Sequence, residues 1–207
     1  MSETRFPDTE GHRIDQAEIL GNSLATILAE ASMPEHSLAS GSAAAISVAL
    51  AAALVCSAAR ALPEGIEASG YVVQAENLRM RAVELVDQNK DHYDAARKAL
   101  EARKSDPGYR DHRIGEAMKD TLGTLGLIAG TGADTAELAA NVAEIAIDEL
   151  RPDAVSAATL AESGTRVANI LIEANLLSAG GGEAVEAARA ELAAAEGSSQ
   201  RAREIVG

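Results

Sequence analysis

The stretch EHSLASGSAAAISVAL, from Glu35 to Leu50, begins with the small and polar residues of a turn and continues into an almost uninterrupted apolar segment. The 17 residues from Ala43 to Ala59 contain no charge. This segment is short for a membrane span, is rich in Ala and Ser, and is followed directly by Arg60, so we expect a central buried helix. We expect Ser40 or Ser42 to cap it and Pro63 to follow its end. The turn before it is either a ligand-binding helix N-terminus or an ordinary cap.

The composition favours helices. Apolar residues make up 47% of the 207 residues, yet aromatic residues make up only 2% and Trp is absent, so the core must consist of Ala, Leu, Val and Ile. Alanine has the highest helix propensity, and its small side chain lets helix backbones approach closely. We therefore predict an all-α fold: one helical domain over residues 15–207, with about six to eight helices, after a flexible lead over residues 1–14.

The apolar periodicity places these helices along the chain. A first helix is expected from Asp15 to Ala31, with Ile19, Leu20, Leu24, Ile27 and Leu28 on one stripe. Further helices are expected over 40–62, over about 66–103 as the one long helix, over 112–130, over 133–150 and over about 153–177, with one or two exposed helices from Glu183 onward.

The net charge of −14 argues against nucleic acid and against an anionic membrane as the main partner, because both require a basic surface. Residues 79–119 hold ten Lys/Arg and eight Asp/Glu, a net of +2, so the rest of the chain carries about −16. An anionic ligand would be repelled least along this segment. Alternatively, the segment is a solvated helix face with ion pairs between residues i and i+4.

Cys56 is the single cysteine, which excludes an intramolecular disulfide, and its neighbours AALVCSAA predict a buried side chain. The first residues, MSETRFPDTEGHR, are polar and lack the apolar segment of a signal peptide, so we expect a cytoplasmic protein.

Four short motifs occur in order along the chain: LASGSAAA at 38–45, NKDHYDA at 89–95, RPDAVSAAT at 151–159 and NILIE at 169–173. Together they resemble the motifs of the cyclodeaminase/methenyltetrahydrofolate cyclohydrolase family, which includes the C-terminal domain of formiminotransferase-cyclodeaminase. The residues that match the family's motifs are Gly41, Ser42, Tyr93, Asp94, Ala95, Val155, Ser156, Asn169 and Ile172.

The departures from the family pattern are as informative as the matches. Leu38, Ala39 and Ser40 replace a proline and two glycines of the turn, and Arg151 and Glu173 each replace an asparagine. Asn89 and Ala157 each take the place of an aspartate. Two carboxylates are thus lost at positions where the family has polar site residues.

The resemblance implies an enzyme that acts on a C–N bond of a folate, by hydrolysing the methenyl bridge of tetrahydrofolate or by expelling ammonia from formiminotetrahydrofolate. It also implies a homodimer, a tetrahydrofolate derivative as substrate and no required cofactor. The residues that it suggests for substrate binding are Ser40, Gly41, Ser42, Tyr93, Ser156 and Asn169.

Both reactions pass through a tetrahedral carbon between two nitrogens, so they need a group that moves protons and a group that stabilises positive charge. Asparagine cannot accept a proton at neutral pH and alanine cannot either, so we expect the family's chemistry to be weakened ~10²-fold or more if position 89 or 157 held the general base.

Two residues are candidates to replace the lost carboxylates in catalysis beside Asn89. His92 lies three residues after Asn89 on an adjacent part of the same helix face, and Glu173 is a new carboxylate at a motif position. The alternatives are an ordinary exposed histidine for His92 and, for Glu173, an ion pair between helices with Arg166 or another basic residue. His36 precedes the glycine turn and is either a residue that closes over a ligand or a surface loop residue. The four histidines show no metal-ligand spacing, so we expect no metal.

Three functional hypotheses remain open from the sequence. The first is a divergent enzyme that acts on a folate or another small nitrogenous substrate. The second is a non-catalytic helical module that binds a ligand or partner without the catalytic carboxylates. The third is a purely structural helical oligomer.

Overall fold

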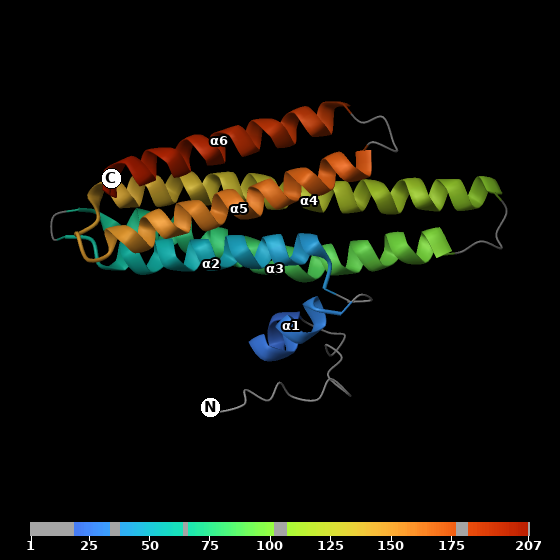
Figure 1. Cartoon of the computed structure of the whole chain (residues 1–207), viewed down its shortest axis with the longest axis horizontal. Coiled ribbons are helices and arrows are strands. Elements are labelled where there is room, and N and C mark those ends of the chain that lie inside the picture. Colours follow the sequence, from blue (N-terminus) through green and yellow to red (C-terminus); the bar gives the residue numbers. More distant parts are fainter. Residues whose placement is uncertain (1–18, 34–37, 64–65, 102–106, 177–181, 207) are drawn as a thin grey trace, which may run out of the picture.

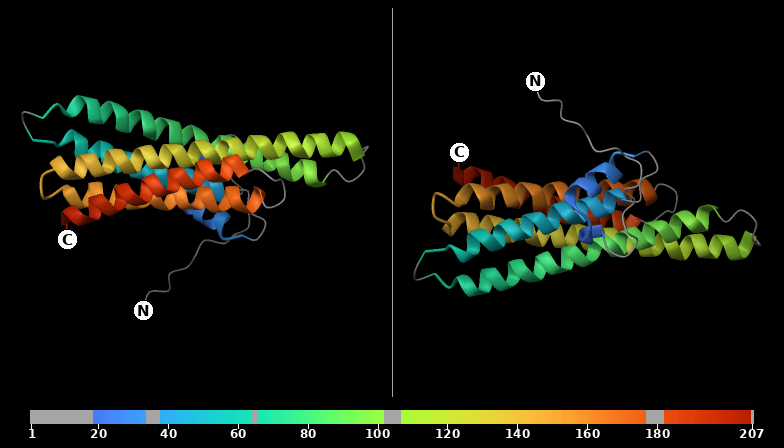
Figure 2. Two further views of the ribbon diagram at one scale, coloured as in Figure 1. Left: turned by 90° about the horizontal axis from the view of Figure 1, so that it is seen from above. Right: turned by 90° about the horizontal axis from the view of Figure 1, so that it is seen from below.

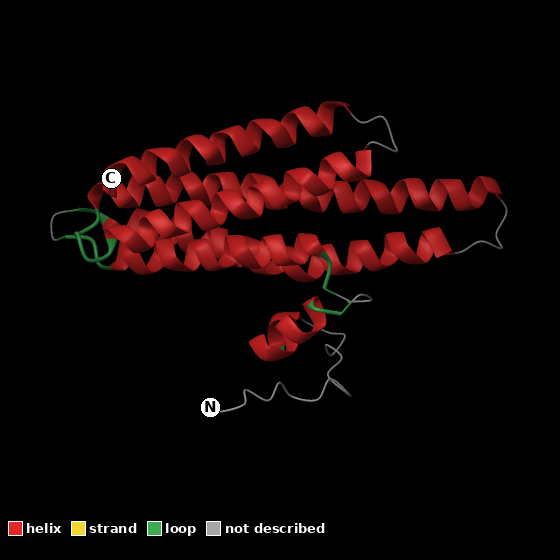
Figure 3. Cartoon of the chain, viewed as in Figure 1, coloured by secondary structure: helices red, strands yellow, loops and turns green. Residues whose placement is uncertain are grey.

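The computed structural model describes residues 19–33, 38–63, 66–101, 107–176 and 182–206. Within these ranges the chain forms a short 3-10 helix, η1 (Ile19–Gly21), six α-helices and no strand (Figure 3). The α-helices are α1 (Leu24–Ala31), α2 (Ser40–Arg60), α3 (Ala68–Glu101), α4 (Pro107–Ile145), α5 (Arg151–Leu176) and α6 (Gly182–Val206). The prediction of an all-α fold is confirmed.

Helices α2 to α5 form a four-helix bundle (Figure 1). Helix α2 packs between α3 and α5, α4 closes the bundle opposite it, and α6 lies along α4 and α5. The ends of α3 and α4 extend past the other helices as a two-helix projection, and α1 lies at the side of the bundle, close to the start of α2, with Ile27 packed in the core (Figures 1 and 2).

Helix α2 is the central element that its composition predicted. By length and composition alone it is apolar enough to span a membrane, but 56% of its apolar window is buried against the other helices, as in the core helix of a soluble protein. Ala45, Ala51, Ala52 and Ala59 are completely buried. These small side chains let α2 lie close to three neighbouring helices.

Gly164 of α5 makes the closest approach to α2. A Cβ atom at this glycine would lie 2.7 Å from Cγ2 of Val48 and 3.0 Å from the carbonyl oxygen of Ala44, so the backbone of α5 nearly touches α2 there. Further contacts fix the direction of α5: the Ser47 hydroxyl donates to the carbonyl of Leu160 (3.0 Å), and Ala168 packs in the same cluster as Ala45. Because numbers rise along α5 as they fall along α2, the two helices are antiparallel.

The first expected helix is shorter than the periodicity indicated. Within the described residues α1 begins only at Leu24, because Ser23 caps it and its side chain accepts a hydrogen bond from the N–H of Thr26 (3.1 Å). The expected single stripe is also wrong. The break at Ser23 leaves Ile19 and Ile27 buried, whereas Leu20, Leu24 and Leu28 are exposed. The start expected at Asp15 and the lead over 1–14 lie outside the described residues.

The two helices expected over 112–130 and 133–150 form one continuous helix, α4. The glycines at 130 and 132 indicated a break because glycine disfavours helix interiors. In the structure the helix continues through both glycines, and Gly132 serves close packing: a Cβ atom at this position would collide with the hydroxyl of Thr165 on α5. The C-terminal tail is likewise one helix that packs on the bundle, with Ala188, Ala195 and Ala202 buried.

Candidate functional site

The glycine and serine of the opening motif lie inside the first turn of α2, not in a loop before it. The N-cap residue is Ala39, which has no side chain able to cap, so the expected cap by Ser40 or Ser42 is not formed. Ser40 is exposed, whereas the buried Ser42 donates its hydroxyl proton to the carbonyl of Val86 on α3 (2.7 Å). Among the described residues, no side chain therefore caps the N–H groups of the first turn, from Ser40 to Ser42.

Asn89 of α3 lies against this first turn. A Cβ atom added to Gly41 would lie 2.7 Å from Cγ of Asn89, and the Asn89 amide Nδ2 donates to the hydroxyl of Ser42 (3.3 Å). Asn89 is 2% exposed, and its carbonyl oxygen Oδ1 has no hydrogen-bond partner among the described residues. A buried amide oxygen without a donor costs free energy, which a ligand N–H would recover.

His92 follows Asn89 by one helical turn and contacts α4. Its Nδ1 lies 2.7 Å from the hydroxyl oxygen of Thr124, and that hydroxyl donates to the carbonyl of Asp120 (3.1 Å). When the Thr124 hydroxyl donates to Asp120, it accepts from Nδ1–H of His92, and in that tautomer of the neutral imidazole the lone pair lies on Nε2. His92 is half-buried and held by a second helix, unlike an ordinary exposed histidine.

Thr124 is the residue that the sequence analysis missed. It is 32 positions from His92, and no local spacing connects the two. Tyr93, the next residue on α3, is 40% exposed.

Asn169 lies on α5 at the same end of the bundle, since its neighbour Ala168 packs in one cluster with Ala45 and Val86. Asn169 is buried, and its amide Nδ2 has no hydrogen-bond partner among the described residues. This end of the bundle thus contains two buried amides with unmet hydrogen-bonding capacity: Asn89 lacks a donor and Asn169 lacks an acceptor.

Glu173 is engaged by α6, and Ser156 lies away from this cluster. Glu173 forms an ion pair with Arg189 of α6 (2.8 Å), so the structure shows the interhelical ion pair that was the alternative interpretation, with Arg189 in place of Arg166. Ser156 is exposed and precedes Gly164 by eight residues, or about 12 Å along α5. Because α2 and α5 are antiparallel, Ser156 lies toward the C-terminal end of α2, away from Ser42.

The charged residues of α3 form the ion pairs expected of a charged helix face. Lys90 pairs with Asp94 at i,i+4 (3.2 Å), and Arg97 pairs with Asp94 and Glu101 (3.7 Å each). Arg97 and Glu101 are exposed, whereas the side chains of Lys90 and Asp94 are only 12% and 21% exposed. These cations already have carboxylate partners. His112 is exposed on α4, and His36 lies outside the described residues.

Cys56 is buried, as predicted. Burial and a hydrogen bond to the Glu76 carboxylate (3.4 Å) both raise the pKa of the Cys56 thiol. Glu76 in turn binds Arg60 (2.7 Å) and Arg79 (2.8 Å). A thiol with a raised pKa is a poor nucleophile, so Cys56 is a packing residue.

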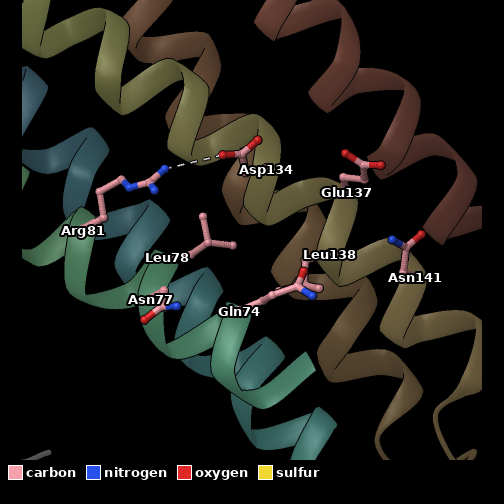
Figure 4. Close-up of a pocket in the computed structure, with 8 residues that line it drawn as sticks. All are labelled: Gln74, Asn77, Leu78, Arg81, Asp134, Glu137, Leu138 and Asn141. Atoms are coloured by element: carbon pink, nitrogen blue, oxygen red, sulfur yellow. Dashed lines mark ion pairs between the residues drawn. The ribbon is translucent and has the colours of Figure 1, made fainter. Parts of the chain in front are cut away.

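A groove of about 380 Å³ lies between α3 and α4, on another part of the bundle (Figure 4). Its walls are polar, and Arg81 and Asp134 form an ion pair across it (3.6 Å). The residues that line it are Gln74, Asn77, Leu78, Arg81, Asp134, Glu137, Leu138 and Asn141. None of the candidate residues from the sequence lines this groove.

Among the described residues no group of three or more His, Cys, Asp and Glu side chains could hold a metal ion. The expectation of no metal remains a prediction.

The family model described as formiminotransferase-cyclodeaminase matches residues 23–194. The chain belongs to this family. The match includes all four motifs, and therefore the cluster around Asn89 as well as Ser156 and Glu173.

A solved structure supports the fold of this formiminotransferase-cyclodeaminase family member. The crystal structure of formiminotetrahydrofolate cyclodeaminase from Thermotoga maritima superposes with a TM-score of 0.78 at 20% sequence identity, and the match covers 91% of this chain and 97% of the other. No curated protein matches the chain by sequence. At this identity the structural likeness establishes the shared helical fold.

Proposed function

We propose that the chain is a divergent folate enzyme that acts on a C–N bond of a one-carbon tetrahydrofolate derivative. Family membership supports the substrate class, because the similar solved structure is that of a formiminotetrahydrofolate cyclodeaminase. The observation that carries the proposal is Oδ1 of Asn89, which is buried beside the start of α2 and has no hydrogen-bond partner among the described residues. We place the substrate at this end of the bundle. A cytoplasmic location and the homodimer implied by the resemblance belong to the same proposal.

The uncapped first turn of α2 supplies the binding groups. Its N–H groups and the positive end of the helix dipole favour a carbonyl or carboxylate oxygen of the substrate. The oxygen of Asn89 accepts from a substrate N–H and stabilises positive charge on the amidine-like unit. Gly41, Ser42 and Asn169 shape and line this site, with Ser40 and Tyr93 at its exposed edge.

His92 is the proton-transfer group in this proposal. Thr124 holds Nδ1 as a donor, so Nε2 of a neutral His92 can accept a proton from the attacking water or from a substrate nitrogen, and can return it to the leaving nitrogen. Glu173 and Ser156 have no part in the proposed site, because Glu173 pairs with Arg189 and Ser156 lies along α5 away from it.

The test is turnover of methenyltetrahydrofolate and formiminotetrahydrofolate, followed by absorbance. The expected result is measurable hydrolysis or deamination that falls ~10²-fold in His92→Gln and changes less than twofold in the matched control Glu173→Gln. Equal turnover by His92→Gln and the wild type would remove His92 from the mechanism.

The alternative is a folate-binding module without catalysis. The replacement of two family aspartates by Asn89 and Ala157 favours it, since neither residue moves protons. Calorimetry distinguishes the two: heat of folate binding without turnover would establish the binding module, and the absence of both binding and turnover would leave a structural oligomer.

A further inference from the structure

The groove between α3 and α4 has charged groups at one end and amides at the other. Arg81 and Asp134 form their ion pair (3.6 Å) at one end, and Gln74 of α3 lies toward Leu138 of α4 at the other (Figure 4). Gln74 precedes Arg81 by two helical turns, as Asp134 precedes Asn141, so each wall of the groove is about 10 Å long. The groove therefore fits a ligand that is elongated along the two helices.

The middle of the groove is apolar. Leu78 lies midway between Gln74 and Arg81 along α3 and is 8% exposed, and Leu138 on the opposite wall is 5% exposed. Contact with these leucines would remove a hydrocarbon chain from water. A ligand with polar ends and a hydrocarbon middle therefore matches the groove better than a uniformly polar one.

The charged end of the groove favours a cation. It contains one guanidinium, that of Arg81, and the two carboxylates of Asp134 and Glu137, a net charge of −1 on a chain of charge −14. Glu137 is exposed, and no Lys or Arg among the described residues forms an ion pair with it. Asp134 and Glu137 are three residues apart on one helix face, so an ammonium group, which has three donors, can bridge them. A planar guanidinium pairs with a single carboxylate.

The amide end of the groove offers both donors and acceptors. Arg201 of α6 donates to Oδ1 of Asn141 (2.9 Å), so Nδ2 of Asn141 is the group that remains to donate to a ligand. Gln74 and Asn77 are exposed and form no hydrogen bond with the other described residues. A side-chain amide matches a peptide unit, because its carbonyl accepts from the peptide N–H and its N–H donates to the peptide C=O.

We propose that this groove binds a lysine residue in an extended peptide segment of a partner protein. The ammonium group lies between Asp134 and Glu137, the four-carbon stem lies on Leu78, and the adjoining peptide unit bonds to the amides at the other end. An extended lysine side chain spans roughly 6 Å from Cα to Nζ, so together with its peptide unit it matches a groove of about 10 Å.

The two ends of the groove together favour this ligand over simpler ones. A free diamine would leave the amides without a partner, and a neutral peptide would leave Glu137 without a cation. The groove lies outside the cluster around Asn89, so the inference goes beyond the proposed function and does not depend on it.

Amide NMR spectra of the full chain, titrated with Nα-acetyl-lysine N-methylamide, test the proposal. The expected result is a set of saturable shifts in the side-chain amide signals of Gln74, Asn77 and Asn141. The dissociation constant should be about 1 mM for a ligand of roughly 14 heavy atoms. The norleucine analogue lacks the ammonium group, and cadaverine lacks the peptide units. Each is expected to bind about fivefold more weakly.

Glu137→Gln removes the carboxylate that has no cation partner among the described residues. It is expected to weaken binding of the lysine probe about fivefold, the size of an exposed ion pair. Glu186→Gln is the matched control, because Glu186 is exposed and its loss changes the charge equally. It lies near the start of α6, about 22 Å before Arg201 along that helix, and should change the affinity less than about twofold. The same spectra show that each variant is folded.

Arg81→Gln tests the sign of the charge that the groove binds. Without the ion pair both carboxylates are available to the ammonium group, so the lysine probe should bind about two- to fivefold more tightly. Weaker binding would show that Arg81 holds an anionic group and would overturn the proposal. The absence of saturable shifts, or equal binding of the norleucine analogue or of cadaverine, would overturn it as well. Equal effects of Glu137→Gln and Glu186→Gln would also do so, since they would indicate only a general attraction to an acidic chain.

Discussion

Gly41 of α2 and Asn89 of α3 are packed so closely that a methyl group on the glycine would lie 2.7 Å from the amide carbon of the asparagine. The family resemblance suggested that this glycine belongs to a turn that binds the substrate. In the structure its hydrogen atom leaves room for the buried amide of Asn89, which also binds Ser42.

Gly41→Ala is therefore expected to destabilise the chain by about 1–3 kcal/mol, although alanine is the better helix former. Asn89 is buried and bonded to Ser42, so its amide cannot move aside without losing that bond. Urea unfolding measures the change. In the double variant with Asn89→Ala the penalty should largely disappear, giving a coupling of about 0.5–3 kcal/mol. Additive effects would show that the two residues are not in contact.

Asn89→Asp is expected to raise turnover of the folate substrate by ~10²-fold, because it restores a group that accepts protons at the position where the family has an aspartate. The substitution also buries a carboxyl group, so a loss of stability at neutral pH should accompany the gain. Asn77→Asp is the control, since Asn77 is an exposed asparagine on the same helix. Unchanged turnover in folded Asn89→Asp would show that the family's chemistry does not depend on this position.

The sequence predicted those features that one helix determines by itself. The uncharged run from Ala43 to Ala59 marked α2 as the central helix, and its small residues indicated close helix packing. The same run also gave the burial of Cys56. These properties depend only on the composition and the spacing of apolar residues within a single segment.

The errors concern contacts between segments distant in sequence. Gly130 and Gly132 suggested a helix end, but the hydroxyl of Thr165 on α5 occupies the space beside Gly132, and α4 continues. Motif order suggested that Ser42 and Ser156 converge, but α2 and α5 are antiparallel, which places them at different levels of the bundle. Arg189, the partner of Glu173, is 16 residues away on another helix.

Gly164→Ala is expected to destabilise the chain by about 1–3 kcal/mol. Its new methyl group would lie 2.7 Å from Cγ2 of Val48 and 3.0 Å from the backbone carbonyl of Ala44, and the backbone carbonyl cannot rotate away. Gly197→Ala on α6 is the matched control, because nothing lies within 4 Å of its added methyl group. The control should gain about 0.5–1 kcal/mol from helix propensity. Thermal unfolding measures both variants. A higher midpoint temperature for Gly164→Ala as well as for Gly197→Ala would contradict the packing argument.

Glu162 gives the fold a dependence on acid pH. Burial opposes its ionisation, since the side chain is 14% exposed, but hydrogen bonds from Arg166, Ser199 and Arg203 outweigh burial and lower the pKa of its carboxyl group. A folded-state pKa below the unfolded value of about 4.3 means that ionised Glu162 stabilises the fold above that pH. This contribution is lost as the pH falls through the lowered pKa.

Glu162→Gln is therefore expected to be less stable than the wild type by about 1 kcal/mol at pH 7, and the difference should shrink as the pH falls below the unfolded value of about 4.3. Urea unfolding from pH 3 to 7, at one protein concentration, measures this difference. Glu173→Gln should change stability by less than half as much, because Glu173 is more exposed and binds only Arg189 among the described residues. A difference for Glu162→Gln that stays constant across this range would mean that the amide disturbs packing, and that the charge of Glu162 does not stabilise the contact between α5 and α6.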